Sequence, residues 1–408
     1  MKRALLILLL LSLCPFLTGC GGGQEIESCL FVLSMAVDPA PDGNLTVTVK
    51  ALSGTQDAAE GSLSASSSGA ANETGGAGMP GDESASKSGG STGLEETEPG
   101  YIVMSATAKS CLRALSLLSA TTPRTVNLSQ LREVVISRTL AETDATLSIL
   151  KEIHAMYRAN GEAIVVVTPD DAGDFIRRQR AILGIRLSKY LEVLFDHFSE
   201  MDTIPPDAQL SSVIAAMESS TGDAAAVYAA GNSFSGTLAL STESDLDRLP
   251  GHLPRTSPAE NEYLGSALFS GPRMTGVLTG EETGLLCLMM GKAQRRTTFI
   301  GDAQYKTNLH TRVARTLGNA DGALEVLIRM SLTRIAGDAS EAQEDIAQRI
   351  ERGCIGVLQK LQAASCDAIG FGRTAIRSSL TIPDWEKTNW PLIYETLPVR
   401  ARAKVKVL

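Results

Sequence analysis

Residues 53–99 consist mainly of glycine, serine, alanine and acidic residues, with almost no large apolar side chain. Such a segment cannot bury enough surface to offset the entropy lost on ordering, so we predict a disordered insertion. Strand-like patterns end just before it, at residues 45–50, and resume just after it, at residues 101–106. The insertion is therefore expected to interrupt one domain rather than to separate two.

The insertion also dominates the charge of the chain. Eight acids and one base give residues 53–99 a net charge of −7, out of −9 for all 408 residues. Loss of Lys2 and Arg3 with a signal peptide would leave −11 on the mature chain and about −4 on its folded parts. Because no domain-wide basic field remains, the composition argues against nucleic acid as a partner.

The N-terminus has the pattern of a signal peptide. Two basic residues precede an apolar run, residues 4–13, which is too short to span a bilayer as a permanent helix. The run leads into four residues that resemble the lipobox of bacterial lipoproteins: Leu17, Thr18, Gly19 and Cys20. In such proteins the cysteine is diacylated and becomes the first residue. The alternative is an ordinary secreted protein cut nearby. We expect a soluble body tethered to the outer face of a membrane.

Hydrophobic periodicity and turn signals predict mixed α and β structure in three units. Residues 164–167 are isoleucine and valine only, which is typical of a strand buried on both faces. The predicted strands are residues 25–37, 45–50, 101–106, 131–137, 162–167, 224–230, 237–240, 266–269, 275–278, 297–300, 307–313, 323–332 and 399–408. The predicted helices are residues 108–119, 143–158, 172–180, 187–198, 210–217, a helix starting at 279, and residues 340–368 and 384–390.

The order of these elements suggests where the units begin and end. After a signal peptide at 1–19, we predict an N-terminal domain at 20–182 that contains the insertion. A middle domain is expected at 183–258, ending in a proline-rich linker, and a C-terminal domain at 259–408.

The cysteines give little sign of disulfides. With Cys14 and Cys20 set aside, five remain, an odd number without a CxxC pair: Cys29, Cys111, Cys287, Cys354 and Cys366. This pattern argues against a disulfide framework and a thiolate zinc site, so we expect small buried hydrophobic side chains. One pair, Cys354 with Cys366, stays open. Twelve residues along one predicted helix would, however, place the two about 18 Å apart, too far to bridge.

No catalytic pattern stands out. HExxH and GxSxG are absent, and a GxGxxA match at 370–375 follows a predicted helix where a dinucleotide fold needs a strand. The acid pairs at 170–171 and 281–282 begin predicted helices, where pairing with the helix dipole explains them. The four histidines are scattered: His154, His197, His252 and His310. We predict no catalytic residue, metal site or cofactor.

The C-terminal residues 399–408 alternate between apolar and basic. In a strand, four positive charges would share one face: Arg400, Arg402, Lys404 and Lys406. One interpretation is a solvated face, or charges that keep a sheet edge from pairing with other molecules. The other is contact with acidic lipid head groups or with an acidic loop of a partner protein, because this stripe lies on an otherwise acidic protein.

Four regions of the chain form a pattern when taken together. They are Cys20 with Glu25-Ile26, Leu30 to Leu33 and Asp38; Leu128 to Thr168 with its strand Ile164 to Val167; Gly276 to Leu286; and Asp367 to Gly372 with Trp385, Asn389, Trp390 and the alternating tail. These regions resemble the Ger(x)C lipoproteins, the C subunits of nutrient germinant receptors of spore-forming bacteria. Their order and spacing carry the resemblance. The family usually has Trp-Asp-Arg after the lipid cysteine, where this chain has three glycines.

The resemblance implies an α+β protein with three mixed α/β domains in an elongated, lipid-anchored body. It also implies attachment to the outer leaflet of the spore inner membrane, integral membrane A and B subunits as partners, and no enzymatic activity. Small-molecule binding is not expected. The main rival is a substrate-binding lipoprotein of a transporter, which would usually show regular βα units and an aromatic cleft, whereas only 4% of residues here are aromatic. A surface hydrolase is the second rival, and the missing nucleophile motif argues against it.

Overall fold

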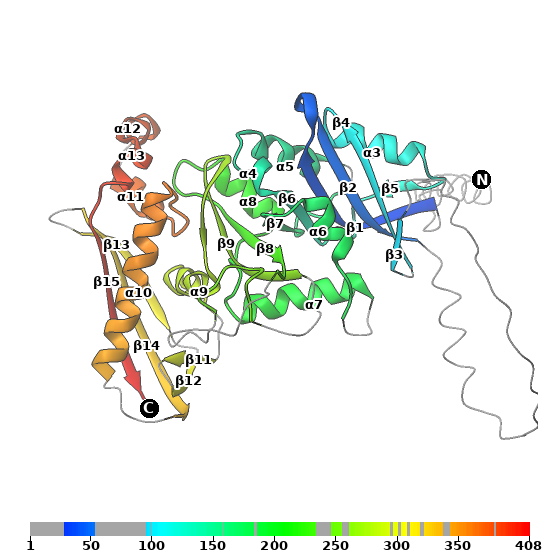
Figure 1. Cartoon of the computed structure of the whole chain (residues 1–408). Coiled ribbons are helices and arrows are strands. Elements are labelled where there is room, and N and C mark those ends of the chain that lie inside the picture. The colour runs from blue at the N-terminus through cyan, green and yellow to red at the C-terminus, as the bar shows by residue number, and fades with distance from the viewer. Residues whose placement is uncertain are drawn as a thin grey trace, which may run out of the picture.

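The computed structural model describes residues 28–53, 95–98, 100–156, 158–182, 186–233, 246–254, 261–293, 297–300, 303–307, 311–318, 322–337, 343–378 and 381–408. Its strands form two sheets that lie side by side in an elongated body (Figure 1). We call the part built on the ten-stranded sheet the large lobe, and the part built on the five-stranded sheet the small lobe. The mixed α+β class expected from the sequence is confirmed.

The large sheet has a parallel centre with antiparallel edges. Four parallel strands lie side by side in the order β8-β7-β6-β1, and antiparallel strands flank them as β10-β9 on one side and β2-β4-β3 on the other. Short β5 pairs with the start of β1. The strands are β1 (Cys29–Pro39), β2 (Leu45–Leu52), β3 (Glu95–Glu98), β4 (Tyr101–Ala108), β5 (Thr125–Asn127), β6 (Glu133–Ser137), β7 (Ile164–Thr168), β8 (Ala225–Gly231), β9 (Asn261–Ser270) and β10 (Arg273–Leu278).

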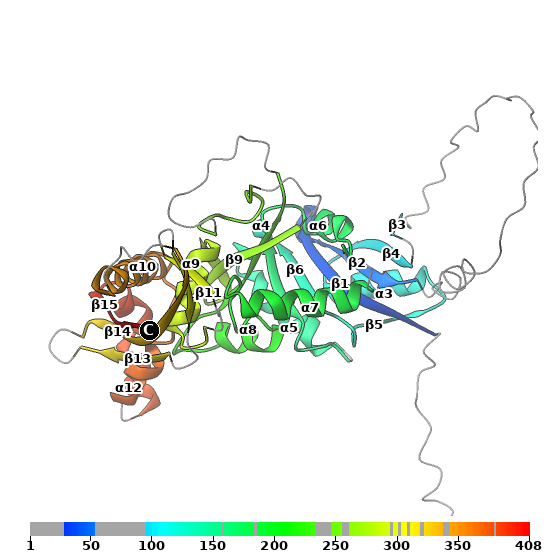
Figure 2. The same ribbon diagram turned by 90° about the horizontal axis from the view of Figure 1, so that it is seen from below.

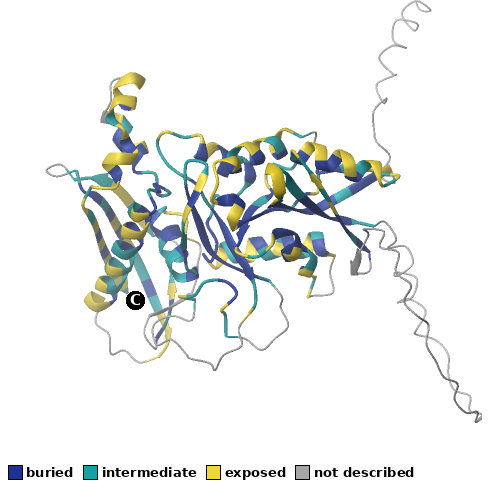
Figure 3. Cartoon of the chain, turned by 45° about the horizontal axis from the view of Figure 1, so that its top comes forward, coloured by how far each residue is buried: buried dark blue, intermediate teal, exposed yellow. Residues whose placement is uncertain are grey.

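Helices cover both faces of this sheet. Successive residues of β7 point to opposite faces: Val165 and Val167 pack in one core and Val166 in the other, all fully buried. This is why the strand is apolar without interruption. One core contains α3 (Cys111–Ala120), α4 (Arg138–Ala141), α5 (Ala145–Ala155) and α8 (Leu210–Met217), and the other contains α6 (Ala172–Arg178) and α7 (Leu187–Glu200). Figure 3 shows the buried strands between half-exposed helices.

The first two strands form an antiparallel hairpin, and the next strand corrects the extent of the insertion. β1 and β2 pair antiparallel from Val32↔Ala51 to Pro39↔Leu45, across a turn at residues 41–43. The last part of the predicted insertion is ordered, because β3 pairs with β4. Composition alone did not reveal this strand, since its pairing comes from a partner strand and not from apolar residues of its own. The rest of the insertion, 54–94, lies outside the described residues, as does the strand predicted at 237–240.

The small lobe packs one long helix on a five-stranded sheet. The strand order is β11-β12-β14-β13, and β15 runs parallel to β14 through nine residue pairs, from Leu324↔Val399 to Leu332↔Val407. The strands are β11 (Thr297–Ile300), β12 (Ala303–Thr307), β13 (Arg312–Leu317), β14 (Leu324–Ala336) and β15 (Val399–Val407). The helices are α9 (Gly280–Met289), α10 (Gln343–Ala363), α11 (Gly372–Ala375), α12 (Ile382–Thr388) and α13 (Trp390–Tyr394).

Several predicted bounds in this lobe need correction. α10 ends at Ala363 and not at 368, so Cys354 and Cys366 do not share one helix. The strand predicted at 307–313 corresponds to the end of β12 and the start of β13, which are separate strands. The predicted start of this helix, residues 340–342, lies outside the described residues. All five cysteines discussed above are buried and free, as expected of small hydrophobic side chains.

The sheets divide the chain differently from the three predicted units. β8 lies between β7 and β9, so residues before 183, between 183 and 258, and after 259 all contribute strands to the large sheet. The pairing of β8 with β9 joins residues such as Ala226 and Ala267, 41 positions apart, and no local pattern specifies that contact. The described strands thus fall into two sheets, with the change of sheet after β10.

A buried carboxylate fixes the junction of the two lobes. Asp367 accepts hydrogen bonds from the backbone N–H groups of residues 370–372, at 2.7–2.9 Å, and from Trp390 Nε1 at 3.0 Å. Its own backbone N–H donates to Asp223, just before β8, at 2.8 Å. Burial raises the pKa of Asp367 to about 6, although these hydrogen bonds oppose the shift. Asp367 therefore connects the two lobes: its carboxylate holds residues 370–372 and Trp390, and its backbone N–H holds Asp223 beside the large sheet.

Candidate functional site

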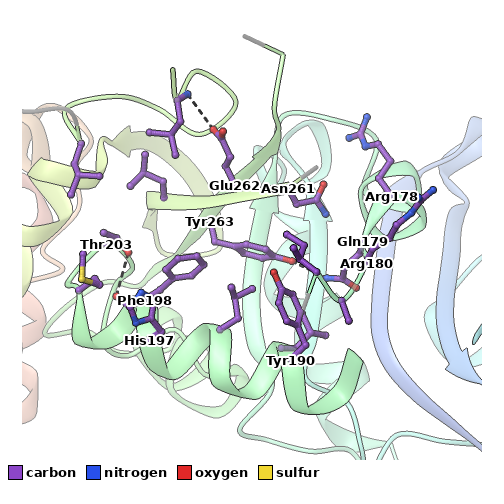
Figure 4. A pocket seen from close by; sticks show the side chains of 18 residues that line it. Arg178, Gln179, Arg180, Tyr190, His197, Phe198, Thr203, Asn261, Glu262 and Tyr263 are labelled. Carbon is purple, nitrogen blue, oxygen red and sulfur yellow. Dashed lines mark hydrogen bonds between the residues drawn. The ribbon is translucent and has the colours of Figure 1, made fainter. Parts of the chain in front are cut away.

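A cavity of about 570 Å³ lies in the large lobe, between α7, β9 and the residues that follow α6 (Figure 4). Its size is that of a small-molecule site. Apolar and aromatic side chains make up much of the wall, among them Tyr190, Leu194 and Phe198 of α7 and Tyr263 of β9. α7 is positioned at its start by the buried hydroxyl of Tyr101, which accepts a hydrogen bond from the Leu187 N–H at 2.7 Å.

Tyr263 is the centre of the aromatic wall. Its ring meets Phe175 and Phe195 edge to face, at centroid distances of 5.6 and 5.4 Å, and lies 6.1 Å from the tilted ring of Phe198. Edge-to-face contacts of this kind are favourable because the positive ring edge meets the negative ring face. The aromatic packing directs the hydroxyl of Tyr263 toward the sheet.

Behind that hydroxyl lies a buried polar cluster. Tyr263 donates to Glu133 at 3.1 Å and accepts from Gln179 Nε2 at 2.8 Å. Gln179 Nε2 also donates to Glu133, and the Ser34 hydroxyl donates to the same carboxylate at 2.7 Å. Lys50, fully buried, donates through Nζ to the carbonyl oxygen of Gln179. We call Ser34, Lys50, Glu133, Gln179 and Tyr263 the buried polar cluster.

The pKa shifts of the buried polar cluster fit a structural role better than a catalytic one. Burial raises the pKa of Glu133, while the hydrogen bonds from Gln179, Ser34 and Tyr263 and the charge of Lys50 lower it. Burial and the neighbouring Glu133 raise the pKa of Tyr263 well above its ordinary value. The donors and acceptors of the cluster are thus paired with one another, and the cluster presents no activated nucleophile.

None of these five residues was predicted from the sequence as part of a site. The available signal was a charged residue within an otherwise apolar strand: Lys50 at the end of 45–50, and Glu133 before Val134, Val135 and Ile136. That signal alone cannot show that the two charges lie in the same interior, because β2 and β6 are separated by β1.

A smaller cavity of about 280 Å³ lies where β7 and β8 end. Asp170 accepts hydrogen bonds there from Arg178 at 2.6 Å and from the Gly231 N–H at 3.0 Å. Asp171 caps α6 by accepting from the Asp174 N–H at 2.9 Å, which confirms the helix start predicted for this acid pair. Glu282 likewise forms a capping box with Thr279 at the start of α9. Both acid pairs therefore have structural roles.

The described residues form neither a metal-binding cluster nor a membrane-spanning helix. In the part of the chain that it describes, no three histidine, cysteine or acidic residues lie close enough to hold a metal ion. None of the described helices is both long and apolar enough to cross a bilayer. The lipobox residues Leu17, Thr18, Gly19 and Cys20 lie outside the described residues.

The alternation of the C-terminal tail is confirmed. Ala401 and Ala403 of β15 are buried under α10 in the core of the small lobe. The four basic residues are exposed on the other side, and we call them the positive stripe: Arg400, Arg402, Lys404 and Lys406. Arg400 pairs with Glu325 of β14 at 3.2 Å, and the other three have no ion pair with a described acid. At the edge of the sheet, the Ala403 N–H donates to Glu351 of α10 at 2.8 Å.

Two long stretches of the chain match known protein families. Residues 80–230 match a family described as spore germination protein N-terminal domain, and residues 264–408 match one described as spore germination B3/GerAC like, C-terminal. A search of curated proteins finds no match. Among solved structures, the crystal structure of the GerBC protein is similar at 13% identity and a TM-score of 0.45, over 92% of this chain and 96% of that one.

Proposed function

Because the chain belongs to the Ger(x)C family of spore germination proteins, we propose that it assembles with two integral membrane subunits into a nutrient germinant receptor. The observation that carries the proposal is the pair of family matches, which follow one another in order along the chain and include parts of both lobes. In this receptor the chain is the C subunit and acts by assembly and not by catalysis. The paired, structural character of the buried polar cluster supports this role.

We propose that Cys20 anchors the subunit to the outer face of the spore inner membrane. The signal-peptide pattern and the lipobox Leu17 to Cys20 support this. A diacylated cysteine supplies two acyl chains, enough for stable attachment. We expect Cys20→Ala to leave an uncut precursor or to release the protein. Unchanged membrane fractionation, together with no loss of metabolic lipid label, would contradict the anchor.

The function is tested in spores that lack this gene. We expect them to lose germination with the nutrients that this receptor serves, and to respond normally to a non-nutrient trigger. The wild-type gene should restore the response, and co-purification should recover both membrane subunits with the restored chain. Normal nutrient germination in the deletion strain, with the genes for all other germinant receptors also removed, would contradict the proposal.

The large-lobe cavity favours one second candidate, a substrate-binding lipoprotein of a transporter. A volume of about 570 Å³ with a mainly apolar and aromatic wall is what such a protein needs. Native mass spectrometry of the purified chain with candidate amino acids separates the two functions. A tight complex that is lost in Phe198→Ala favours the transporter, and no bound species favours the receptor subunit without a ligand of its own.

A further inference from the structure

Helix α3 exposes two leucines. Leu112 and Leu117 are 56% and 52% exposed, although the opposite side of the helix, with Ala114 and Leu118, is buried against the large sheet. Residues 112, 113, 116, 117 and 120 share the outward side, as expected from helical spacing, and all are exposed. Arg113 lies on this side, and the exposed Lys109 lies two residues before the helix. The outward side of α3 thus combines large apolar groups with positive charge.

This outward side lies beside the point where the chain enters the fold. Four residues join α3 to β5, and Thr125 at the start of β5 pairs with Cys29 at the start of β1. Figures 1 and 2 both place α3, β5 and the start of β1 at the same end of the body. Cys20 is nine residues before Cys29, and a chain of that length reaches about 30 Å at most. The C-terminal end of α3, four residues from the strand that pairs with Cys29, is therefore within reach of an anchor at Cys20.

The acidic insertion is a poor alternative cover for this surface. It leaves the fold nearby, since Arg124 donates to the carbonyl oxygen of Ser53 at 2.8 Å. Its acids could approach Lys109 and Arg113. However, residues 54–94 consist mainly of small and acidic side chains, and covering Leu112 and Leu117 requires large apolar contact. A membrane surface offers both anionic head groups and an apolar layer beneath them.

We propose that the outward side of α3 rests in the head-group region of the membrane, with Leu112 and Leu117 inserted and Lys109 and Arg113 at the phosphates. The proposal rests on the anchoring at Cys20 proposed above. It makes the anchor and α3 one bipartite membrane contact, which fixes the end of the large lobe at the membrane. Exposure of apolar side chains alone does not mark the contact: Ile382 and Leu392, 72% and 62% exposed, lie on α12 and α13 at the opposite end of the body.

Tryptophan quenching tests the contact. The lipidated chain is inserted into vesicles of phosphatidylglycerol and brominated phosphatidylcholine. The two native tryptophans, Trp385 and Trp390, are buried at the far end and serve as the unquenched reference. We expect the additional emission of Leu117→Trp to fall at least twofold in brominated vesicles, and that of the matched control Leu392→Trp to stay unchanged. Both substitutions are at exposed positions, and circular dichroism melting verifies the fold.

A second arm separates this proposal from the anchor. Residues 21–408 with an N-terminal histidine tag are held on vesicles that contain a nickel-chelating lipid, so that attachment no longer depends on lipidation. Quenching of Leu117→Trp in this arm supports the α3 contact even if Cys20 is not acylated. If Leu117→Trp is quenched no more than Leu392→Trp while the chain stays bound in either arm, the α3 contact is wrong, and the anchor still stands. If the emission of Leu117→Trp is quenched only after residues 56–94 are deleted, the insertion covers α3 in the intact chain. That result would also overturn the proposal.

Discussion

The two sheets differ in where their charged side chains lie. The large sheet is covered on both faces and holds Lys50 and Glu133 inside, fully buried and paired within a polar cluster. The outer strand of the small sheet has one face under α10 and displays four basic residues on the other. A charge enclosed in a core is costly unless it is paired, whereas a charge on an open face costs little. Charges of the first kind therefore bear on folding, and charges of the second kind are available for partners.

The largest expected effect tests the buried side of this comparison. Glu133→Ala would remove a buried carboxylate that interacts electrostatically with Lys50 and is the acceptor used by Tyr263 and Gln179. Removing one member of a buried charge pair typically costs about 3–5 kcal/mol, so we expect a loss of that size in the free energy of unfolding in urea. The double variant Glu133→Ala/Lys50→Met should recover part of the loss. A cost below about 1 kcal/mol for the single variant would show that the cluster does not stabilise the large lobe.

The lobe junction gives the next effect, through pH. The pKa of Asp367 is raised from 3.8 to about 6, chiefly by burial, so the folded protein holds a proton there that the unfolded chain releases. Stability contributed by the protonated form is present near pH 4 and lost as pH rises to about 6, by about 3 kcal/mol for a shift of this size. Urea unfolding between pH 4 and 7 measures it. Asp367→Asn should reduce the change in the free energy of unfolding over this pH range. If the variant and the wild-type protein show the same pH dependence, the attribution to Asp367 is wrong.

The insertion should matter little for stability. Because the entropy of closing a flexible loop grows only with the logarithm of its length, we expect deletion of residues 56–94 to change the free energy of unfolding by about 1 kcal/mol or less. The deletion stops before β3, since Glu95–Glu98 pairs with β4 and belongs to the sheet. Thermal melting is the measurement. Loss of a cooperative transition would show that the insertion packs against the large lobe.

The smallest effect on stability tests the exposed side of the comparison. Changing Arg400, Arg402, Lys404 and Lys406 to glutamine keeps the apolar alternation of β15 and removes the exposed ion pair of Arg400 with Glu325. Exposed pairs contribute little, so the free energy of unfolding should change by less than about 1 kcal/mol. Binding to membrane subunits or to anionic vesicles should fall, most clearly at low salt, if the positive stripe is a contact surface. If binding to the membrane subunits and to anionic vesicles is unchanged at low salt, the positive stripe is only a solvated face.

Local patterns in the sequence predicted most elements and few of their contacts. The strands predicted at 162–167 and 399–408 correspond to β7 and β15, because the pattern within each strand reports its own burial. The start of α9 was found from a local signal too, since the acid pair 281–282 lies in its first turn. β12 and β13 were merged because the end of β12 and the start of β13 are polar and show little apolar alternation. The single large sheet and the buried polar cluster were missed because they depend on residues brought together from distant positions, such as Ser34, Glu133 and Tyr263.

The parallel pairing of β14 with β15 has a consequence for the order in which surfaces form during synthesis. All strands of the large sheet have been made once the ribosome passes Leu278, so that lobe can fold while the rest of the chain is still emerging. The positive stripe, in contrast, exists as an ordered face only after residues 399–407 have emerged and β15 has docked beside β14. A partner that recognises this face would bind only chains synthesised through β15, and products that terminate before it would be left out of the complex.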